Sequence, residues 1–112
     1  MRTLMISILA LSLTSFTVGS GAKMRITVVD ENNAVVSGAK VLVFANHDDY
    51  ENEDNIVASG ETNAKGFVQF SNLKEQKYYV LIKKDNLNNH HTHNETDALH
   101  IKGKNRFEIM IN

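Results

Sequence analysis

Short apolar runs separated by turn-forming residues recur along residues 24–111, and this pattern constrains the fold more than any other feature of the chain. Within the runs, apolar and polar residues alternate, or apolar residues follow one another, which is typical of half-buried and fully buried β-strands. No window of helical length beyond residue 22 has a clear 3.6-residue period. About seven short, regularly spaced strands predict an all-β fold, either a single antiparallel β-sandwich or a small barrel. We expect strands at residues 24–28, 41–44, 56–58, 67–70, 78–82, 99–101 and 107–111.

The first two predicted strands differ in pattern. In the first, Met24, Ile26 and Val28 alternate with polar residues, so we expect one face of the strand in the core. The second, residues 41–44, is apolar on both faces, which predicts a central position in its sheet. Later in the chain, the residues expected to share one core face are Val68, Phe70, Tyr78, Val80 and Ile82.

Polar stretches between the runs are interpreted as turns and loops. Asn33 and Gly66 stand in turns where a left-handed backbone is expected, because Asn and Gly tolerate it better than other residues. Residues 46–55 form an acidic stretch around Tyr50 and are predicted to be a loop. Residues 85–97 are rich in Asn and His and are predicted to be a second, longer loop.

Length, cysteine content and charge limit the function. A chain of 112 residues is sufficient for one domain. It has no cysteine, which excludes disulfides, thiolate nucleophiles and cysteine-ligated zinc. The formal net charge of −1 gives no reason to expect nucleic acid or an anionic membrane surface as a partner.

The first 22 residues have the organisation of a signal peptide. Arg2 provides a positive start, residues 4–13 are an apolar run, and the small residues that follow offer cleavage near Ser20 or Ala22. The alternative, an uncleaved membrane anchor, is disfavoured because the run is shorter than the roughly 20 residues that span a bilayer. We therefore predict a signal peptide over residues 1–22 and one domain over residues 23–112, exported to the periplasm or secreted and free of the membrane after cleavage. Removing the segment deletes Arg2 and no acid, so the formal charge becomes −2.

Two stretches carry a resemblance to a known family. Residues 28–41 read VVDENNAVVSGAKV, in which Asp30 is followed by a turn and then by Gly38, Ala39 and Val41 entering the second strand. Residues 62–82 read TNAKGFVQFSNLKEQKYYVLI. Their matching positions are Thr62, Gly66, Phe70, Asn72, Leu73 and Tyr78.

These stretches resemble the carboxypeptidase-regulatory-like and collagen-adhesin B-type domains, which are transthyretin-like (prealbumin-like) sandwiches. The resemblance implies an Ig-like, transthyretin-like antiparallel β-sandwich of about seven strands. The sequence departs from the family pattern at several positions, where glycine, proline or aspartate is more usual. These positions are Asn33, Val35, Ser37, Asn63 and Gln76.

Proteins of the families that this sequence resembles carry out two kinds of chemistry, and the residues of this chain argue against both. Some family members form a Lys–Asn isopeptide bond assisted by a buried acid. Lys23 and Asn112 are the candidates here, but the strand over residues 78–84 has no acid to move the protons. Transthyretin-like hydrolases use clustered His and Arg and end in Tyr-Arg-Gly-Ser, whereas this chain ends in Phe-Glu-Ile-Met-Ile-Asn. We therefore predict no enzyme activity and name no catalytic residue.

The histidines are the one cluster of side chains that could carry a chemical function. His90, His91, His93 and His100 lie close together in sequence, and His91 and His93 would project from the same face of an extended segment. Such a pair can bind Cu, Ni or Zn, with His100 or a carboxylate completing the site. The plainer interpretation is a solvated loop. The acidic stretch 46–55 likewise lacks the glycine and spacing of a calcium-binding loop, which favours a solvated face.

Taken together, the residues favour an exported, non-enzymatic β-sandwich that binds a protein or glycan partner, or has a structural role, at the cell envelope. The first alternative is a small metal-binding protein that uses residues 85–100. The second is a transthyretin-like hydrolase, which would require several histidines to converge on a pocket with a strongly perturbed pKa.

Overall fold

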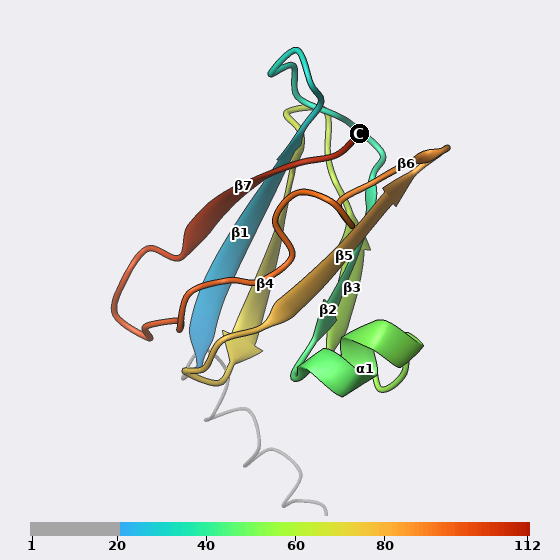
Figure 1. The fold of residues 1–112 in the computed structure, drawn as a ribbon. Helices are drawn as coiled ribbons and strands as arrows, with labels where there is room; N and C mark the ends of the chain where they lie inside the picture. Colours follow the sequence, from blue (N-terminus) through green and yellow to red (C-terminus); the bar gives the residue numbers. More distant parts are fainter. Residues whose placement is uncertain (1–20) are drawn as a thin grey trace, which may run out of the picture.

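The computed structural model describes residues 21–112, which form two β-sheets packed face to face (Figure 1). The three-stranded sheet has the order β4-β1-β7, with β1 at Ala22–Val29, β4 at Phe67–Leu73 and β7 at Arg106–Met110. The four-stranded sheet has the order β3-β2-β5-β6, with β3 at Ala58–Glu61, β2 at Lys40–Phe44, β5 at Tyr79–Lys84 and β6 at Leu87–Asn88. One helix, α1 at His47–Asn52, packs on the outside of this sheet. The predicted all-β sandwich is confirmed. Nearly all of the predicted signal peptide lies outside the described residues.

The strands form where the sequence pattern predicts them. Met24, Ile26 and Val28 of β1 are fully buried and alternate with half-exposed residues. Strand β2 is central as expected, between β3 and β5, and four of its five residues are buried. Both of its faces are covered, the inner one by the three-stranded sheet and the outer one by α1.

One pairing differs from the antiparallel expectation. Strand β1 pairs with β4 in antiparallel orientation but with β7 in parallel orientation, with Arg25 opposite Arg106 and Val29 opposite Met110. This register places Lys23 and Asn112 at opposite ends of the pair, about 26 Å apart for eight residues at about 3.3 Å each. These two side chains therefore cannot form the isopeptide bond considered above.

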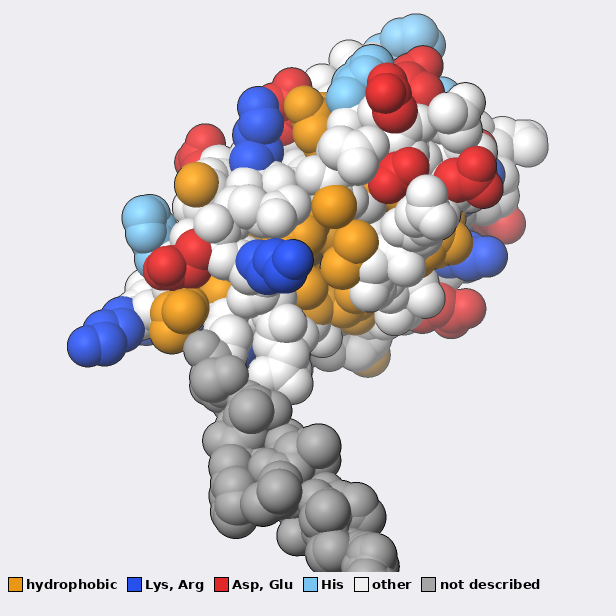
Figure 2. Space-filling model, turned by 90° about the horizontal axis from the view of Figure 1, so that it is seen from below, with side chains coloured by type: hydrophobic (Ala, Val, Ile, Leu, Met, Phe, Trp, Pro, Cys, Tyr) orange, Lys and Arg blue, Asp and Glu red, His pale blue; other side chains and the backbone are white. Residues whose placement is uncertain are grey.

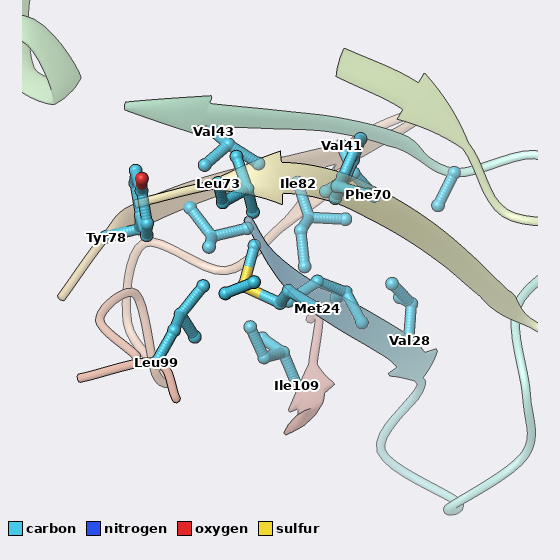
Figure 3. Close-up of a cluster of buried hydrophobic side chains, with 14 of the residues drawn as sticks. Met24, Val28, Val41, Val43, Phe70, Leu73, Tyr78, Ile82, Leu99 and Ile109 are labelled. Carbon is cyan, nitrogen blue, oxygen red and sulfur yellow. The ribbon is translucent and has the colours of Figure 1, made fainter. Parts of the chain in front are cut away.

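The main core fills the space between the two sheets. Figure 3 shows Met24 and Val28 of β1 and Ile109 of β7 facing Val41 and Ile82 of the other sheet. Among the described residues of this cluster, Tyr78 is the only one with an ionisable side chain, and its hydroxyl accepts a hydrogen bond from the Lys74 backbone N–H at 2.9 Å. Val68 and Phe70 pack against the same cluster as Tyr78, Val80 and Ile82, as predicted. Burying each large side chain contributes about 1.5–3 kcal/mol.

Asparagine and glycine shape the turns. Asn33 has a φ of 64° and Gly66 a φ of 82°, which confirms the left-handed conformations predicted for both. The Asn63 side-chain oxygen accepts hydrogen bonds from the backbone N–H groups of Lys65 and Phe67, and so closes the turn around Gly66. A Cβ at Gly66 would lie 2.6 Å from the Cβ of Val35, so a larger residue is excluded by space as well as by φ.

The structure differs from the predicted elements at four places. Residues 99–101 are not a strand, because Leu99 packs into the core as a single buried side chain while Ile101 is 47% exposed. The acidic stretch contains α1, and the predicted loop 85–97 contains the short strand β6. Strand β3 begins only at Ala58, whereas Ile56 and Val57 precede it and are exposed. No helix in the described part of the chain is long and apolar enough to span a membrane.

Buried polar side chains hold the connecting segments in place. The Thr62 hydroxyl accepts from the Ala39 N–H at 2.9 Å and donates to the Val36 carbonyl at 2.7 Å. The Asn105 amide donates to the carbonyls of Lys23 and His100, at 2.8 Å each. The Ala39 N–H would otherwise be buried without a partner, and the other three bonds tie partly buried carbonyls to the connecting segments. They do so in a chain without a disulfide or a proline.

Candidate functional site

Helix α1 forms because its ends are capped by side-chain and backbone hydrogen bonds. Asn46 is the N-cap, and its side-chain oxygen accepts from the Asp49 N–H at 2.8 Å. Asp48 and Asp49 place negative charge in the first turn, where the helix dipole favours it. Glu53, with a φ of 52°, ends the helix in the left-handed conformation. The predicted loop is therefore wrong over residues 47–52, and part of the acidic stretch serves to cap a helix.

Tyr50 anchors the helix to the outer face of the four-stranded sheet. Its ring is 8% exposed and packs with Phe44 in an edge-to-face arrangement, with 6.1 Å between the ring centroids. The ring of Tyr79 in β5 also lies 6.1 Å from that of Tyr50, measured between centroids. The members of this second cluster are Leu42, Phe44, Tyr50 and Leu81, with Tyr79 packed against them. Burial raises the pKa of Tyr50 above its usual value of 10, and a hydrogen bond from Asn94 partly opposes the shift.

A hollow of about 330 Å³ lies between α1 and the segment that follows β6. We call it the α1 groove. Its polar lining residues are His47, Tyr50, Glu51, Glu53, His90 and Asn94. Asn94 also lines a neighbouring hollow of about 570 Å³ that includes Lys77, His93 and Glu95. The two hollows therefore adjoin along the outer face of the sheet. Figure 2 shows acidic side chains gathered on the side of the molecule's lower end where α1 lies.

Asn89 holds the far wall of the α1 groove against β5. Its side chain is fully buried and makes the hydrogen bonds to β5 that a neighbouring strand would otherwise make. The side-chain oxygen accepts from the Ile82 N–H, and the side-chain amide donates to the Val80 carbonyl, both at 2.8 Å. The Asn94 carbonyl accepts from the Val80 N–H at 2.9 Å. Only Lys83 and Lys84 of β5 pair with β6, and the hydrogen bonds with Asn89 and Asn94 satisfy the next part of the same β5 edge. These bonds hold His90 and Asn94 beside α1.

The charged groups around the groove are mostly paired. Lys77 Nζ lies 2.9 Å from Glu95 Oε1, and Lys83 Nζ lies 3.0 Å from Glu53 Oε1. The hydrogen bond and charge of Lys77 lower the pKa of Glu95, and Glu95 raises the pKa of Lys77 in return. All four groups are about half exposed, so solvent screens these pairs and they add little to stability. Their effect is to set the orientation of carboxylates that line the hollows.

The structure distributes the predicted metal ligands over separate places. His90 lines the α1 groove, His93 lines the adjoining hollow, and His100 lies in the turn over residues 100–103 beside Glu75. Residues 89–92 form a turn, in which the Thr92 N–H donates to the Asn89 carbonyl, so the extended geometry expected for His91 and His93 is wrong. Within residues 21–112, no three His, Asp or Glu side chains are grouped to hold a metal ion. Metal binding by these histidines stays a prediction.

Sequence reasoning missed His47 and Asn94 as groove residues, and Tyr79 as the ring beside His47 and Tyr50. The available signal was Asn46, three residues before Asp49, which is the spacing of an N-cap and a first-turn acid. With a helix there, His47 and Tyr50 lie on one face and meet Tyr79, whose ring centroid is 5.5 Å from that of His47. Across residues 21–112, no histidine ring makes a hydrogen bond, and the His47–Glu51 pair at 3.6 Å is the one ion pair with a histidine.

The fold is similar to domains of two solved pilin structures. One is the major pilin subunit of Bacillus cereus, matched over 82% of this chain with a TM-score of 0.59 and 15% sequence identity. The other is the backbone protein of the group B streptococcus pilus 2b, also matched over 82% of this chain, with a TM-score of 0.54 and 16% identity. No protein-family model matches the sequence, and neither does any curated protein.

These similarities support a collagen-adhesin B-type, transthyretin-like sandwich, and at this level of identity they concern the fold alone. The chain spans 30% and 41% of the lengths of the two pilin chains. It therefore corresponds to one part of each.

Proposed function

We propose that this chain is a non-enzymatic structural module of the cell envelope, and that it contacts a protein or glycan partner through the α1 groove. The observation that carries the proposal is the match of 82% of the chain to two proteins that build pili. A small sandwich of this kind serves as a building block when its core is closed and its loops are fixed.

The closed core supports a non-enzymatic role. Hydrolytic chemistry needs a nucleophile or an activated water beside a base that a third group orients. The Tyr78 hydroxyl is the one polar side-chain group of the cluster packed between the two sheets, in the described part of the chain. The histidines that a transthyretin-like hydrolase would use are exposed, and His90, His93 and His100 line three different hollows. Nothing in this arrangement orients a base toward a nucleophile.

The composition of the α1 groove supports a polar partner. Asn94 offers amide groups, Glu51 offers a carboxylate, and the rings of Tyr50 and His47 offer apolar edges. Such a mixture, hydrogen-bonding groups around aromatic rings, recognises peptide backbones and sugar hydroxyls alike. One lining residue, Leu81, belongs to β5, and a strand holds a binding surface more firmly than a free loop does.

Export is part of the proposal, through the apolar run at residues 4–13. Of the two cleavage positions, Ser20 fits the fold better, because Ala22 is fully buried, belongs to β1 and pairs with Leu73. Cleavage after Ser20 leaves β1 whole, whereas cleavage after Ala22 removes its first residue. Intact-mass measurement of the exported protein distinguishes the two products, and a protein that retains residues 1–20 in the cytoplasmic fraction would refute this part of the proposal.

A capture experiment tests the groove. Immobilised protein is incubated with solubilised envelope from the native cell, and retained proteins and glycans are compared between the wild type and the double variant His47→Ala, Glu51→Gln. Glu31→Gln, in the exposed turn after β1, is the matched control. We expect the wild type and the control to retain the same partner and the groove variant to lose it. Equal retention by all three proteins would contradict the role of the groove.

A further inference from the structure

Four basic side chains meet on the outer face of the three-stranded sheet. A hollow of about 130 Å³ there is lined by Lys23, Arg25, Lys104 and Arg106, together with Met24, Gln69, Gly103 and Asn105. No Asp or Glu is among the described residues that line it. We call it the cationic hollow. It is on the opposite side of the sandwich from the α1 groove, so it is independent of the proposed function.

The register of β1 and β7 forces these charges together. Arg25 is directly opposite Arg106 in the parallel pair. Lys23 and Lys104 each precede one of these arginines by two residues, and both line the same hollow. Like charges at opposed positions on neighbouring strands destabilise a sheet. None of the three ion pairs within residues 21–112 includes any of the four cations. The chain therefore keeps an unfavourable arrangement that a bound anion would relieve.

Arg25 has hydrogen-bonding capacity to spare. Its guanidinium stacks on Phe67 at 4.0 Å from the ring centroid and donates one bond, to Gln69 Oε1 at 3.3 Å. Among the described residues, Arg25 Nε is the buried side-chain nitrogen without a hydrogen-bond partner. A guanidinium carries five N–H donors, which suit an oxyanion with several oxygens.

Protection of a sheet edge from pairing does not explain the position of all four cations. Lysines and arginines on edge strands prevent sheets from pairing with other molecules, and β7 is an edge strand. Arg25, however, is on the central strand β1 and is half-buried, where it guards no edge. The nearest acid on this face of β7 is Glu108, opposite Thr27, and it forms no ion pair with the cations within residues 21–112.

We propose that the cationic hollow binds the phosphate group of an anionic ligand. A phosphate presents more charge and more acceptor oxygens than a carboxylate, so it can accept from two arginines and two lysines together. Because the hollow is close to the surface, binding weakens as ionic strength rises.

The test is a titration with inorganic phosphate at low ionic strength, followed by the backbone amide resonances of the purified protein. We expect saturable shifts around Arg25, Lys104 and Arg106. Arg106→Gln, at an exposed position, should weaken binding about tenfold, as for the loss of one charge-assisted hydrogen bond. Lys65→Gln removes an equal charge from a distant turn and should leave binding unchanged.

Stability provides a second measurement. In phosphate-free buffer, Arg106→Gln should melt at the same temperature as the wild type or higher, because it removes a repulsion. Phosphate should raise the melting temperature of the wild type and of Lys65→Gln equally, and that of Arg106→Gln less. A glycerophosphodiester titrated in parallel distinguishes the source: binding indicates phosphate within a polymer, and binding of inorganic phosphate alone indicates a free or terminal group. Three results would overturn the proposal: shifts that do not saturate with phosphate, acetate binding as tight as phosphate binding, or a loss of phosphate affinity in Lys65→Gln as large as that in Arg106→Gln.

Discussion

Asn89→Ala removes one small buried amide, and we expect it to lower the free energy of unfolding substantially. The wild-type side chain makes hydrogen bonds with the Ile82 N–H and the Val80 carbonyl at 2.8 Å each, and with the His93 carbonyl at 3.1 Å. Alanine leaves the two β5 groups buried without partners, because the segment that follows β6 covers them. Each buried, unpaired group costs about 1–3 kcal/mol. The His93 carbonyl, on an exposed residue, can turn to water and adds little.

The summed cost for the two β5 groups is about 3–4 kcal/mol after partial relaxation. This is a large share of the roughly 5–15 kcal/mol by which a domain is stable. At about 4–8 °C per kcal/mol for a domain of 60–100 residues, the melting temperature should fall by about 12–30 °C. The segment carrying His90 and Asn94 should also lose its amide-exchange protection before the rest of the sandwich unfolds.

Urea unfolding followed by circular dichroism measures the free-energy difference by linear extrapolation. Asn86→Ala is the matched control, since Asn86 is exposed in the turn between β5 and β6 and should change stability by less than about 0.5 kcal/mol. A loss below about 1 kcal/mol in Asn89→Ala would refute the reasoning, because it would mean that water or a shifted loop satisfies β5 equally well.

Three further outcomes are expected. Tyr50→Ala should cost about 3 kcal/mol in urea unfolding and release α1, because it empties the centre of the second apolar cluster; an unchanged unfolding curve would show that the helix is held by its caps alone. The Glu95 carboxyl should titrate below 4.5 by NMR and return toward that value in Lys77→Gln. Because its folded pKa is depressed, its contribution to stability is present above its unfolded pKa and disappears as the pH falls through the folded value. Calorimetry with Zn²⁺ or Cu²⁺ should show no stoichiometric submicromolar site; a site abolished by His91→Ala and His93→Ala would favour the metal-binding alternative.

Much of the sandwich was predictable because its strands follow simple periodicity. Met24, Ile26 and Val28 bury alternate side chains, and both faces of β2 are apolar because two layers cover it. The same rule failed at residues 99–101, where Leu99 and Ile101 alternate like a strand. The Leu99 side chain instead packs into the core from an irregular segment. The Leu99 backbone N–H donates a hydrogen bond to the Gln76 carbonyl.

The candidate site was less predictable, because it depends on contacts between distant parts of the chain. Helix α1 has six residues, too few to show a helical period, and its stability comes from capping and from Tyr50 packing on the sheet. The cationic hollow required the register of β1 and β7, which places Arg25 against Arg106. Net charge conceals such a cluster, since cations and anions on opposite faces cancel in the sum.

The parallel pairing of β1 and β7 also governs when the molecule can fold. Its partners are about 80 residues apart in sequence, so β1 has β4 on one side but lacks its second neighbour until Arg106–Met110 have been synthesised. Contacts of such long range slow folding, and they keep an emerging chain open for as long as its last strand is missing. A chain interrupted before Arg106 would leave one edge of β1, the central strand of its sheet, unpaired, and unpaired strand edges promote aggregation.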